Sequence, residues 1–144
     1  MVKHRTGSHT VSRLTVHLVW VTKYRYQILE GEVQKRCREF LIQDCESLDV
    51  FILKGAVGKD HVHMHIEYPP KHSISYIMKQ LKGRSSRMLQ KEFPHLKKRY
   101  WGRHFWAKGF GAWSTGNITD KMIQEYIEHH RRPEDKSRDN FLLE

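Results

Sequence analysis

The 144-residue sequence has no long hydrophobic run and very little cysteine. No apolar stretch approaches the roughly 20 residues of a membrane-spanning helix, and the polar first 13 residues do not resemble an export signal. The only two cysteines, Cys37 and Cys45, lie eight residues apart in a stretch with helical periodicity. A helical rise of about 12 Å over that interval is too long for a disulfide between them. We therefore expect reduced thiols, no membrane partner and a cytoplasmic protein.

Acidic residues are also few. The chain has 16 Asp and Glu against 26 Lys and Arg, which gives a formal net charge of +10. The excess is concentrated in residues 79–108, where ten basic residues accompany a single acid, Glu92. Aromatic residues recur in the same segment, so it combines charge for phosphate binding with flat surfaces for base stacking. This pattern favours single-stranded nucleic acid as the partner; the alternative is an ordinary solvated basic face.

The length allows one domain with a proper core but not two. Hydrophobic periodicity predicts strands at 14–21, 50–53, 61–68 and 105–113, and helices at 31–47, after Ser73 and after residue 117 or 119. The order β-α-β-β-α-β predicts an α+β fold: a ferredoxin-like (split βαβ) antiparallel sheet with packed helices and one extra C-terminal helix. We expect a single domain over 1–132 and a polar C-terminal tail over 133–144.

Histidine alternates along the third predicted strand. His61, His63, His65 and Glu67 share one face, because side chains two residues apart on a strand point to the same side. With 11 His in the chain, about 0.8 His-x-His pairs are expected by chance, but only about 0.06 runs of three. A face of imidazoles and a carboxylate suits a divalent metal ion, although a polar face turned to solvent would show the same pattern.

Four motifs occur together along the chain. They are His17-Leu18-Val19-Trp20 with Lys23-Tyr24-Arg25, Asp60-His61-Val62-His63, Leu81-Lys82-Gly83-Arg84-Ser85-Ser86, and Gln124-Glu125-Tyr126-Ile127-Glu128. In order and spacing they resemble the single-tyrosine HUH transposases of small bacterial insertion sequences, the transposase A group, with the REP-associated tyrosine transposases as relatives. The likeness runs from about residue 17 to residue 130 and so covers most of the chain.

The resemblance implies that Tyr126, on the extra C-terminal helix, is the nucleophile. It also implies that His61 and His63 bind the metal, with His130 as a third ligand one helical turn after the tyrosine. Residues four apart on a helix share a face, so Tyr126 and His130 can approach one ion together. His65 stands where the family usually has an apolar residue, so His65 stays open as an alternative ligand, as does the neighbour of His130, His129.

Basic residues supply the candidate DNA contacts. Lys23 and Arg25 resemble family positions near the DNA, and Lys82, Arg84 and Arg87 in the predicted second helix are candidates to hold the DNA backbone. A solvated surface is the alternative for each of them.

The resemblance also implies a reaction. Mg²⁺ or Mn²⁺ polarises the scissile phosphate while the oxygen of Tyr126 attacks phosphorus, which yields a 5′-phosphotyrosine link and a free 3′-hydroxyl. One phosphoester replaces another, so rejoining needs no ATP, and the chain has no G-x-x-x-x-G-K-[ST] phosphate loop. The implied substrate is single-stranded DNA with subterminal hairpins at the element ends, bound by a homodimer whose active sites form in trans.

Two other readings use the same residues. Lys108-Gly109-Phe110-Gly111-Ala112-Trp113 resembles the start of an RNP1 motif, so a non-catalytic RNA-recognition module is one alternative. Two features count against this alternative. The motif lies on the fourth predicted strand, whereas RNP1 belongs on the third, and Ala112 stands where an aromatic residue should stack on a base. The other alternative keeps the HUH chemistry in a replication initiator or in a domesticated hairpin-binding relative.

Overall fold

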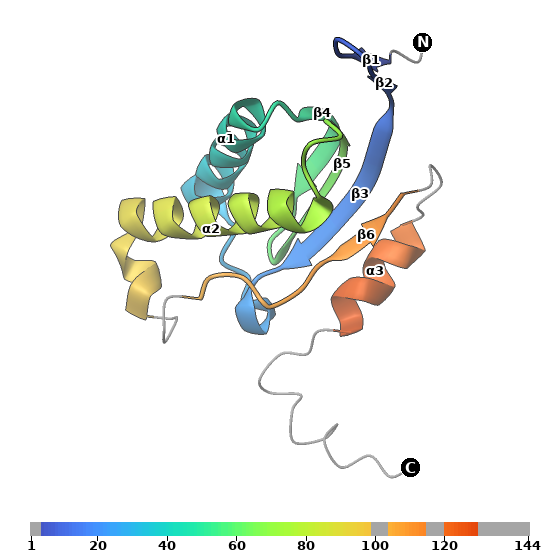
Figure 1. Ribbon diagram of the computed structural model, residues 1–144. Helices are drawn as coiled ribbons and strands as arrows, with labels where there is room; N and C mark the ends of the chain where they lie inside the picture. Colours follow the sequence, from blue (N-terminus) through green and yellow to red (C-terminus); the bar gives the residue numbers. More distant parts are fainter. Residues whose placement is uncertain (1–3, 99–103, 115–119, 130–144) are drawn as a thin grey trace.

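A computed structural model describes residues 4–98, 104–114 and 120–129 of the chain (Figure 1). The elements are β1 (Arg5–Thr6), β2 (Val11–Ser12), β3 (Leu14–Val21), the 3-10 turn η1 (Lys23–Arg25), α1 (Gly31–Ser47), β4 (Phe51–Val57), β5 (His61–Tyr68), α2 (Ile74–Glu92), the 3-10 turn η2 (Pro94–Lys98), β6 (Gly111–Trp113) and α3 (Asp120–His129). Four strands form an antiparallel sheet in the order β4-β5-β3-β6. This order confirms the predicted split βαβ fold, because β5 lies between β3 and β4, and β3 lies between β5 and β6.

The two faces of this sheet are covered differently (Figure 1). Helices α1 and α2 pack on one face, where Leu18 and Trp20 of β3 are fully buried in the main core. Helix α3 packs on the other face, where Ile127 contacts Val19 and Val21. Strand β3 is therefore buried on both sides, as its nearly continuous apolar sequence predicts, because successive side chains point to opposite faces.

Several local predictions are confirmed. The bounds of β3, α1 and β5 agree with the predicted ranges, and the Ser73 hydroxyl caps α2 by accepting a hydrogen bond from the backbone N–H of Tyr76 at 3.0 Å. Cys37 and Cys45 are buried free thiols, and burial raises the pKa of each to about 12, so both stay protonated.

None of the helices in the described part of the chain is both long and apolar enough to cross a bilayer. The predicted boundary at residue 132 lies outside the described residues.

Two strand lengths differ from the prediction. Strand β4 continues to Val57, through the glycine expected to open a turn, because Gly55 and Val57 pair with Met64 and Val62 of β5. Strand β6 is much shorter than 105–113. Before it, Gly109 has φ +83°, which breaks the extended conformation, and Trp106 pairs with Thr22 only through an isolated bridge.

The first strands form a small hairpin that the sequence did not predict. Figure 1 shows this hairpin at the start of β3, beyond the helical layer. Arg5 anchors it: its guanidinium donates to Glu67 at 2.9 and 2.6 Å and to the Asp49 carboxylate at 2.7 Å, and it stacks over the Phe51 ring. The Glu67 carboxylate, predicted to belong to a metal-binding face, is thus engaged by a cation from the N-terminal hairpin.

Candidate active site

The strand histidines lie on the sheet face that α3 covers. In the β3–β5 ladder, His61 is opposite Val21 and His63 is opposite Val19. Residues directly opposite each other in a ladder project to the same face. Val19 and Val21 are also the two residues on which Ile127 of α3 packs. The fold therefore brings the predicted metal-binding strand and the predicted tyrosine helix to one face, although they are about sixty residues apart in sequence.

His61 is held by the residue that precedes it. Its Nδ1 lies 3.0 Å from Asp60 Oδ1, and Asp60 Oδ2 accepts from Arg25 Nε at 3.3 Å. Asp60 is only 7% exposed. Burial by itself would raise the pKa of Asp60, but the hydrogen bond with His61 and the charge of Arg25 together bring it below its usual value, so the carboxylate is ionised. A glycine gives the ring its space, since a Cβ at Gly58 would fall 2.4 Å from His61 Cε1.

The remaining strand histidines form a stack with a histidine of β3. The rings of His17 and His65, which are opposite each other in the ladder, lie parallel with centroids 3.8 Å apart, and the His63 ring lies 5.8 Å from that of His17. His65 Nε2 is buried and has no hydrogen-bond partner among the described residues. Burial, together with the charges of His17 and Arg13, lowers the pKa of His65. His65 is therefore held as a neutral, stacked ring.

Tyr126 is half-buried on α3. Its ring packs edge-on against Trp113 of β6, with ring centroids 6.3 Å apart and planes at 88°. Gly111 leaves room for it, because a Cβ there would lie 3.1 Å from Tyr126 Cδ1 and 2.5 Å from Trp113 Cη2. Burial raises the pKa of Tyr126 to about 12, so in this docked position the phenol is neutral at physiological pH.

The imidazoles of His61 and His63 are suitable ligands for a divalent metal, but the described residues do not supply a third ligand beside them. With Nδ1 of His61 bonded to Asp60, its Nε2 presents a lone pair, which is the form in which imidazole binds a metal. Within residues 4–98, 104–114 and 120–129, however, no three His, Cys, Asp or Glu side chains are grouped so that they could hold an ion. The predicted third ligand, His130, lies outside the described residues, and the alternative His129 is exposed at the end of α3. The described part therefore supplies the pair His61 and His63.

The predicted DNA-binding residues differ in their surroundings. Arg25 binds Asp60, Lys82 donates to the carbonyls of Ala107 and Gly109 at 2.7 and 3.0 Å, and burial lowers the Lys82 pKa. Arg84 lies 2.9 Å from the buried Asp44. Lys23 lies over the ring of Tyr24. Arg87 is exposed on α2. Three of these five cations, Arg25, Lys82 and Arg84, thus have hydrogen-bond or ion-pair partners within the fold.

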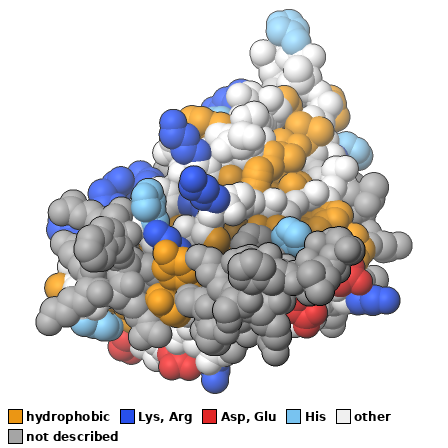
Figure 2. Space-filling model, turned by 90° about the horizontal axis from the view of Figure 1, so that it is seen from below, with side chains coloured by type: hydrophobic (Ala, Val, Ile, Leu, Met, Phe, Trp, Pro, Cys, Tyr) orange, Lys and Arg blue, Asp and Glu red, His pale blue; other side chains and the backbone are white. Residues whose placement is uncertain are grey.

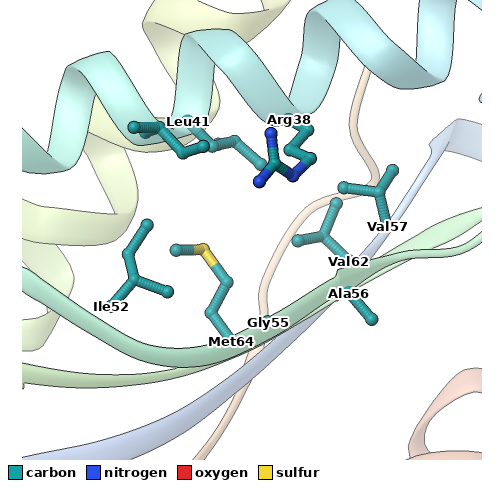
Figure 3. A pocket seen from close by; sticks show the side chains of 9 residues that line it. Arg38, Leu41, Ile52, Gly55, Ala56, Val57, Val62 and Met64 are labelled. Carbon is teal, nitrogen blue, oxygen red and sulfur yellow. The ribbon is translucent and has the colours of Figure 1, made fainter.

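A cavity of about 160 Å³ lies on the opposite side of the sheet (Figure 3). Arg38 and Leu41 of α1 point toward it from above, and Val62 and Met64 of β5 line its floor. Since Val62 and Met64 alternate with the histidines, this cavity cannot include the imidazole face. It belongs to the packing of α1 on the sheet edge.

Sequence reasoning missed the contacts that hold this site. The sequence does contain a signal for the role of Asp60, because an acid adjacent to a candidate ligand can make an orienting hydrogen bond. The engagement of Glu67 by Arg5 had no such signal, because the partners are 62 residues apart.

Residues 10–130 match the family described as "Transposase IS200 like". The transposase of insertion sequence IS200 from Salmonella typhimurium is 41% identical over 129 residues, which are 90% of this chain and 84% of the relative. The ISDra2 transposase TnpA of Deinococcus radiodurans is 32% identical over 124 residues, 86% of this chain and 89% of the relative.

Solved structures agree in fold. A crystal structure from Deinococcus radiodurans R1, of a protein provisionally assigned as a transposase, superposes with a TM-score of 0.83 at 33% identity and covers 89% of this chain and 98% of its own. A REP-associated tyrosine transposase bound to a REP hairpin has a TM-score of 0.55 at 17% identity, over 90% of this chain and 68% of the other, and supports the fold alone.

These comparisons place the molecule among the DNA transposases. The chain belongs to the IS200-like transposase family, which confirms the resemblance identified from its motifs. This membership decides against the RNA-recognition alternative. The sheet face that would carry stacking aromatics in such a module instead carries the histidines and is partly covered by α3.

Proposed function

We propose that this transposase cleaves and rejoins single-stranded DNA at insertion-sequence ends through a covalent bond between Tyr126 and a 5′-phosphate. One observation carries the proposal: α3, which bears Tyr126, packs on Val19 and Val21, the cross-strand neighbours of His63 and His61. A nucleophile and two potential metal ligands thus share one face of the sheet. Such a convergence is what a metal-assisted phosphoryl transfer needs.

In the proposed reaction the Tyr126 oxygen attacks phosphorus, and the bond from phosphorus to the 3′-oxygen breaks. The products are a 5′-phosphotyrosine and a free 3′-hydroxyl, and attack by a 3′-hydroxyl on the phosphotyrosine rejoins the strand. When bound by His61, His63 and His130, Mg²⁺ or Mn²⁺ would stabilise the negative charge that develops on the phosphate. Because burial raises the pKa of Tyr126 to about 12, its proton must be removed as the phenol leaves its docked position or as it reacts.

The proposed substrate is a DNA hairpin next to the cleavage site. The solved REP-associated neighbour is bound to a REP hairpin and has the same fold, which supports this substrate class. Lys79, Arg87 and Lys91 are exposed on α2 and can contact phosphates. Figure 2 shows Lys and Arg side chains gathered to one side of a band of hydrophobic side chains on the face drawn there. A basic surface beside an apolar surface suits single-stranded DNA, because its phosphates and its unpaired bases are both exposed.

The proposed assembly is a homodimer with active sites in trans. Strand β4 is an edge of the sheet, and Phe51 and Leu53 on it are 60% and 44% exposed. An edge strand with exposed large hydrophobic side chains is a surface that favours pairing with another chain. A second copy is the simplest partner for it.

The cleavage step can be tested with labelled single-stranded DNA from the element ends, incubated with and without Mg²⁺. We expect a covalent protein–DNA adduct only with the metal. Tyr126→Phe removes only the attacking oxygen, so hairpin binding should persist while the adduct disappears; an adduct in that variant would disprove the nucleophile. Flanking imperfect palindromes in the genome would separate a mobile element from a domesticated copy or a replication initiator.

Mixing two inactive variants tests the trans arrangement. Tyr126→Phe and His63→Ala subunits that exchange form heterodimers. If the active sites form in trans, one of the two sites in every heterodimer contains both Tyr126 and His63 and is intact. Cleavage should return, with the label only on the His63→Ala chain, which size-tagged subunits would reveal. In cis every site keeps one lesion, so verified heterodimers without activity would rule the trans arrangement out. Tyr126 packs on the sheet of its own chain here, so the mixture also tests whether this docked position is the reacting one.

A further inference from the structure

Three side chains form a hydrogen-bonded series at the start of β5. Arg25 Nε lies 3.3 Å from Asp60 Oδ2, and Asp60 Oδ1 lies 3.0 Å from His61 Nδ1. Asp60 is buried, and Arg25 and His61 are partly buried. The carboxylate therefore bridges a permanent cation on one side and a candidate metal ligand on the other.

The backbone that presents Arg25 is strained and firmly held. Tyr24 and Arg25 have φ values of +61° and +54°, a left-handed conformation that is unfavourable for residues other than glycine. The turn is closed by the Arg25 N–H, which donates to the Thr22 carbonyl at 2.9 Å. Thr22 in turn donates its N–H to the Asp60 carbonyl at 2.9 Å. The strained turn is thus bonded to the same residue that its arginine contacts.

This arrangement determines which nitrogen of His61 is available. An ionised carboxylate accepts the proton on Nδ1, so the lone pair of the neutral ring lies on Nε2. Space for the ring in this orientation depends on Gly58, where a Cβ would lie 2.9 Å from His61 Nε2 and closer still to Cε1. Rotation and tautomer of the imidazole are both constrained before any metal binds.

We propose that Asp60 is a positioning residue that fixes the tautomer and orientation of His61, and that Arg25 acts through Asp60. The inference rests on the proposed function, in which His61 is a metal ligand. In this inference Arg25 supports the metal site by holding Asp60, whereas the sequence analysis predicted that Arg25 contacts DNA. The two roles predict different results when metal and DNA are studied separately.

The first measurement is Mn²⁺ binding to the DNA-free full-length protein by calorimetry. Loss of an outer hydrogen-bond partner of a ligating histidine typically weakens metal binding about 10- to 100-fold. We expect that range for Asp60→Ala, a smaller loss for Asp60→Asn, which keeps an acceptor oxygen, and a loss for Arg25→Gln. Lys59→Gln is the matched control, because it removes a neighbouring cation whose amine lies 3.6 Å from Glu30, and should leave Mn²⁺ affinity unchanged.

The second measurement is the tautomer of His61 by ¹⁵N NMR of the metal-free protein. Wild type should carry its proton on Nδ1, Asp60→Asn should retain that form, and Asp60→Ala should shift toward the Nε2-protonated form. A merely structural aspartate would not move this signal in a folded variant. Hairpin affinity in EDTA completes the set: Arg25→Gln should bind like wild type if Arg25 serves Asp60, and more weakly if it contacts phosphate.

The outcomes separate this inference from the proposed function. If His63→Ala abolishes Mn²⁺ binding but Asp60→Ala and Arg25→Gln do not weaken it, the positioning role is wrong and the metal site stands. If wild type binds no Mn²⁺, or His63→Ala binds it equally well, the proposed metal site fails. In that case the tautomer still decides the role of Asp60: an Nδ1 proton that does not respond to Asp60→Ala overturns it.

Discussion

Gly111→Ala should displace Tyr126 from its docked position without weakening hairpin binding. The added Cβ would lie 2.5 Å from Trp113 Cη2 and 3.1 Å from Tyr126 Cδ1, whereas ordinary contacts begin near 3.4 Å. The Trp113 ring must therefore retreat by about 0.9 Å and the Tyr126 ring by about 0.3 Å, each figure being the difference from 3.4 Å. Because the rings pack edge-on, displacing Trp113 displaces Tyr126 further.

The size of the effect follows from this displacement. Overpacking of this kind costs about 1–3 kcal/mol of folding stability. A shift of about 1 Å in a reacting group can cost about 100-fold in rate. If Tyr126 reacts from its docked position, single-turnover adduct formation on labelled single-stranded DNA should fall roughly 10- to 100-fold. In either arrangement of the active sites, urea unfolding should show the loss of stability.

A matched substitution elsewhere isolates the steric cause. A Cβ at Gly83 in α2 meets no heavy atom within 4 Å, and Gly83→Ala should raise stability by about 0.5–1 kcal/mol without slowing adduct formation. Adding Trp113→Phe to Gly111→Ala removes the outer ring atoms that collide, so the double variant should recover part of the loss. Wild-type cleavage and stability in Gly111→Ala alone would refute the packing argument.

The other predictions concern charge and protonation. Arg5→Met should destabilise the fold by about 3 kcal/mol, because it leaves the carboxylate of Glu67, 4% exposed, without its cation; urea unfolding measures this, and a loss below about 0.5 kcal/mol would contradict it. The Tyr126 phenol should titrate near pH 12 in the ¹³Cζ NMR spectrum, and a midpoint at the ordinary value of 10 would show that the ring is not docked. Because the unfolded phenol loses its proton near pH 10 while the docked phenol keeps it, the free energy of unfolding should fall as pH rises from 10 toward 12. Hairpin affinity should fall steeply between low and physiological salt in fluorescence anisotropy, and a flat response would reject phosphate contacts by the basic segment.

Local sequence was sufficient for much of the fold. Strand 61–68 and helix 31–47 have their predicted bounds because alternation and helical spacing are strong and both segments end at clear signals, such as the prolines after Tyr68. The histidine face follows from the same alternation. Family motifs, in turn, connected Tyr126 with His61 and His63, which no local pattern could do.

Strand lengths could not be read in this way. Gly55 is a poor strand residue taken alone, but its partner Met64 in β5 supplies a ladder that extends β4. Conversely, the apolar stretch before β6 looked like a strand, yet Lys82 takes the carbonyls of Ala107 and Gly109. In both places a partner outside the local stretch determined its conformation.

The sequence by itself determined the order of the main elements and the histidine face, because each depends on periodicity or on the spacing of nearby residues. Its resemblance to a known family, and no local pattern, made Tyr126 the nucleophile candidate. Only the tertiary structure decided which polar groups are paired: Arg25 with Asp60, Arg5 with Glu67, Arg84 with Asp44. A basic residue has the same sequence signature whether it faces solvent, DNA or a buried carboxylate. The choice is made by the energetic requirement that a buried charge find a partner, and that partner comes from another part of the chain.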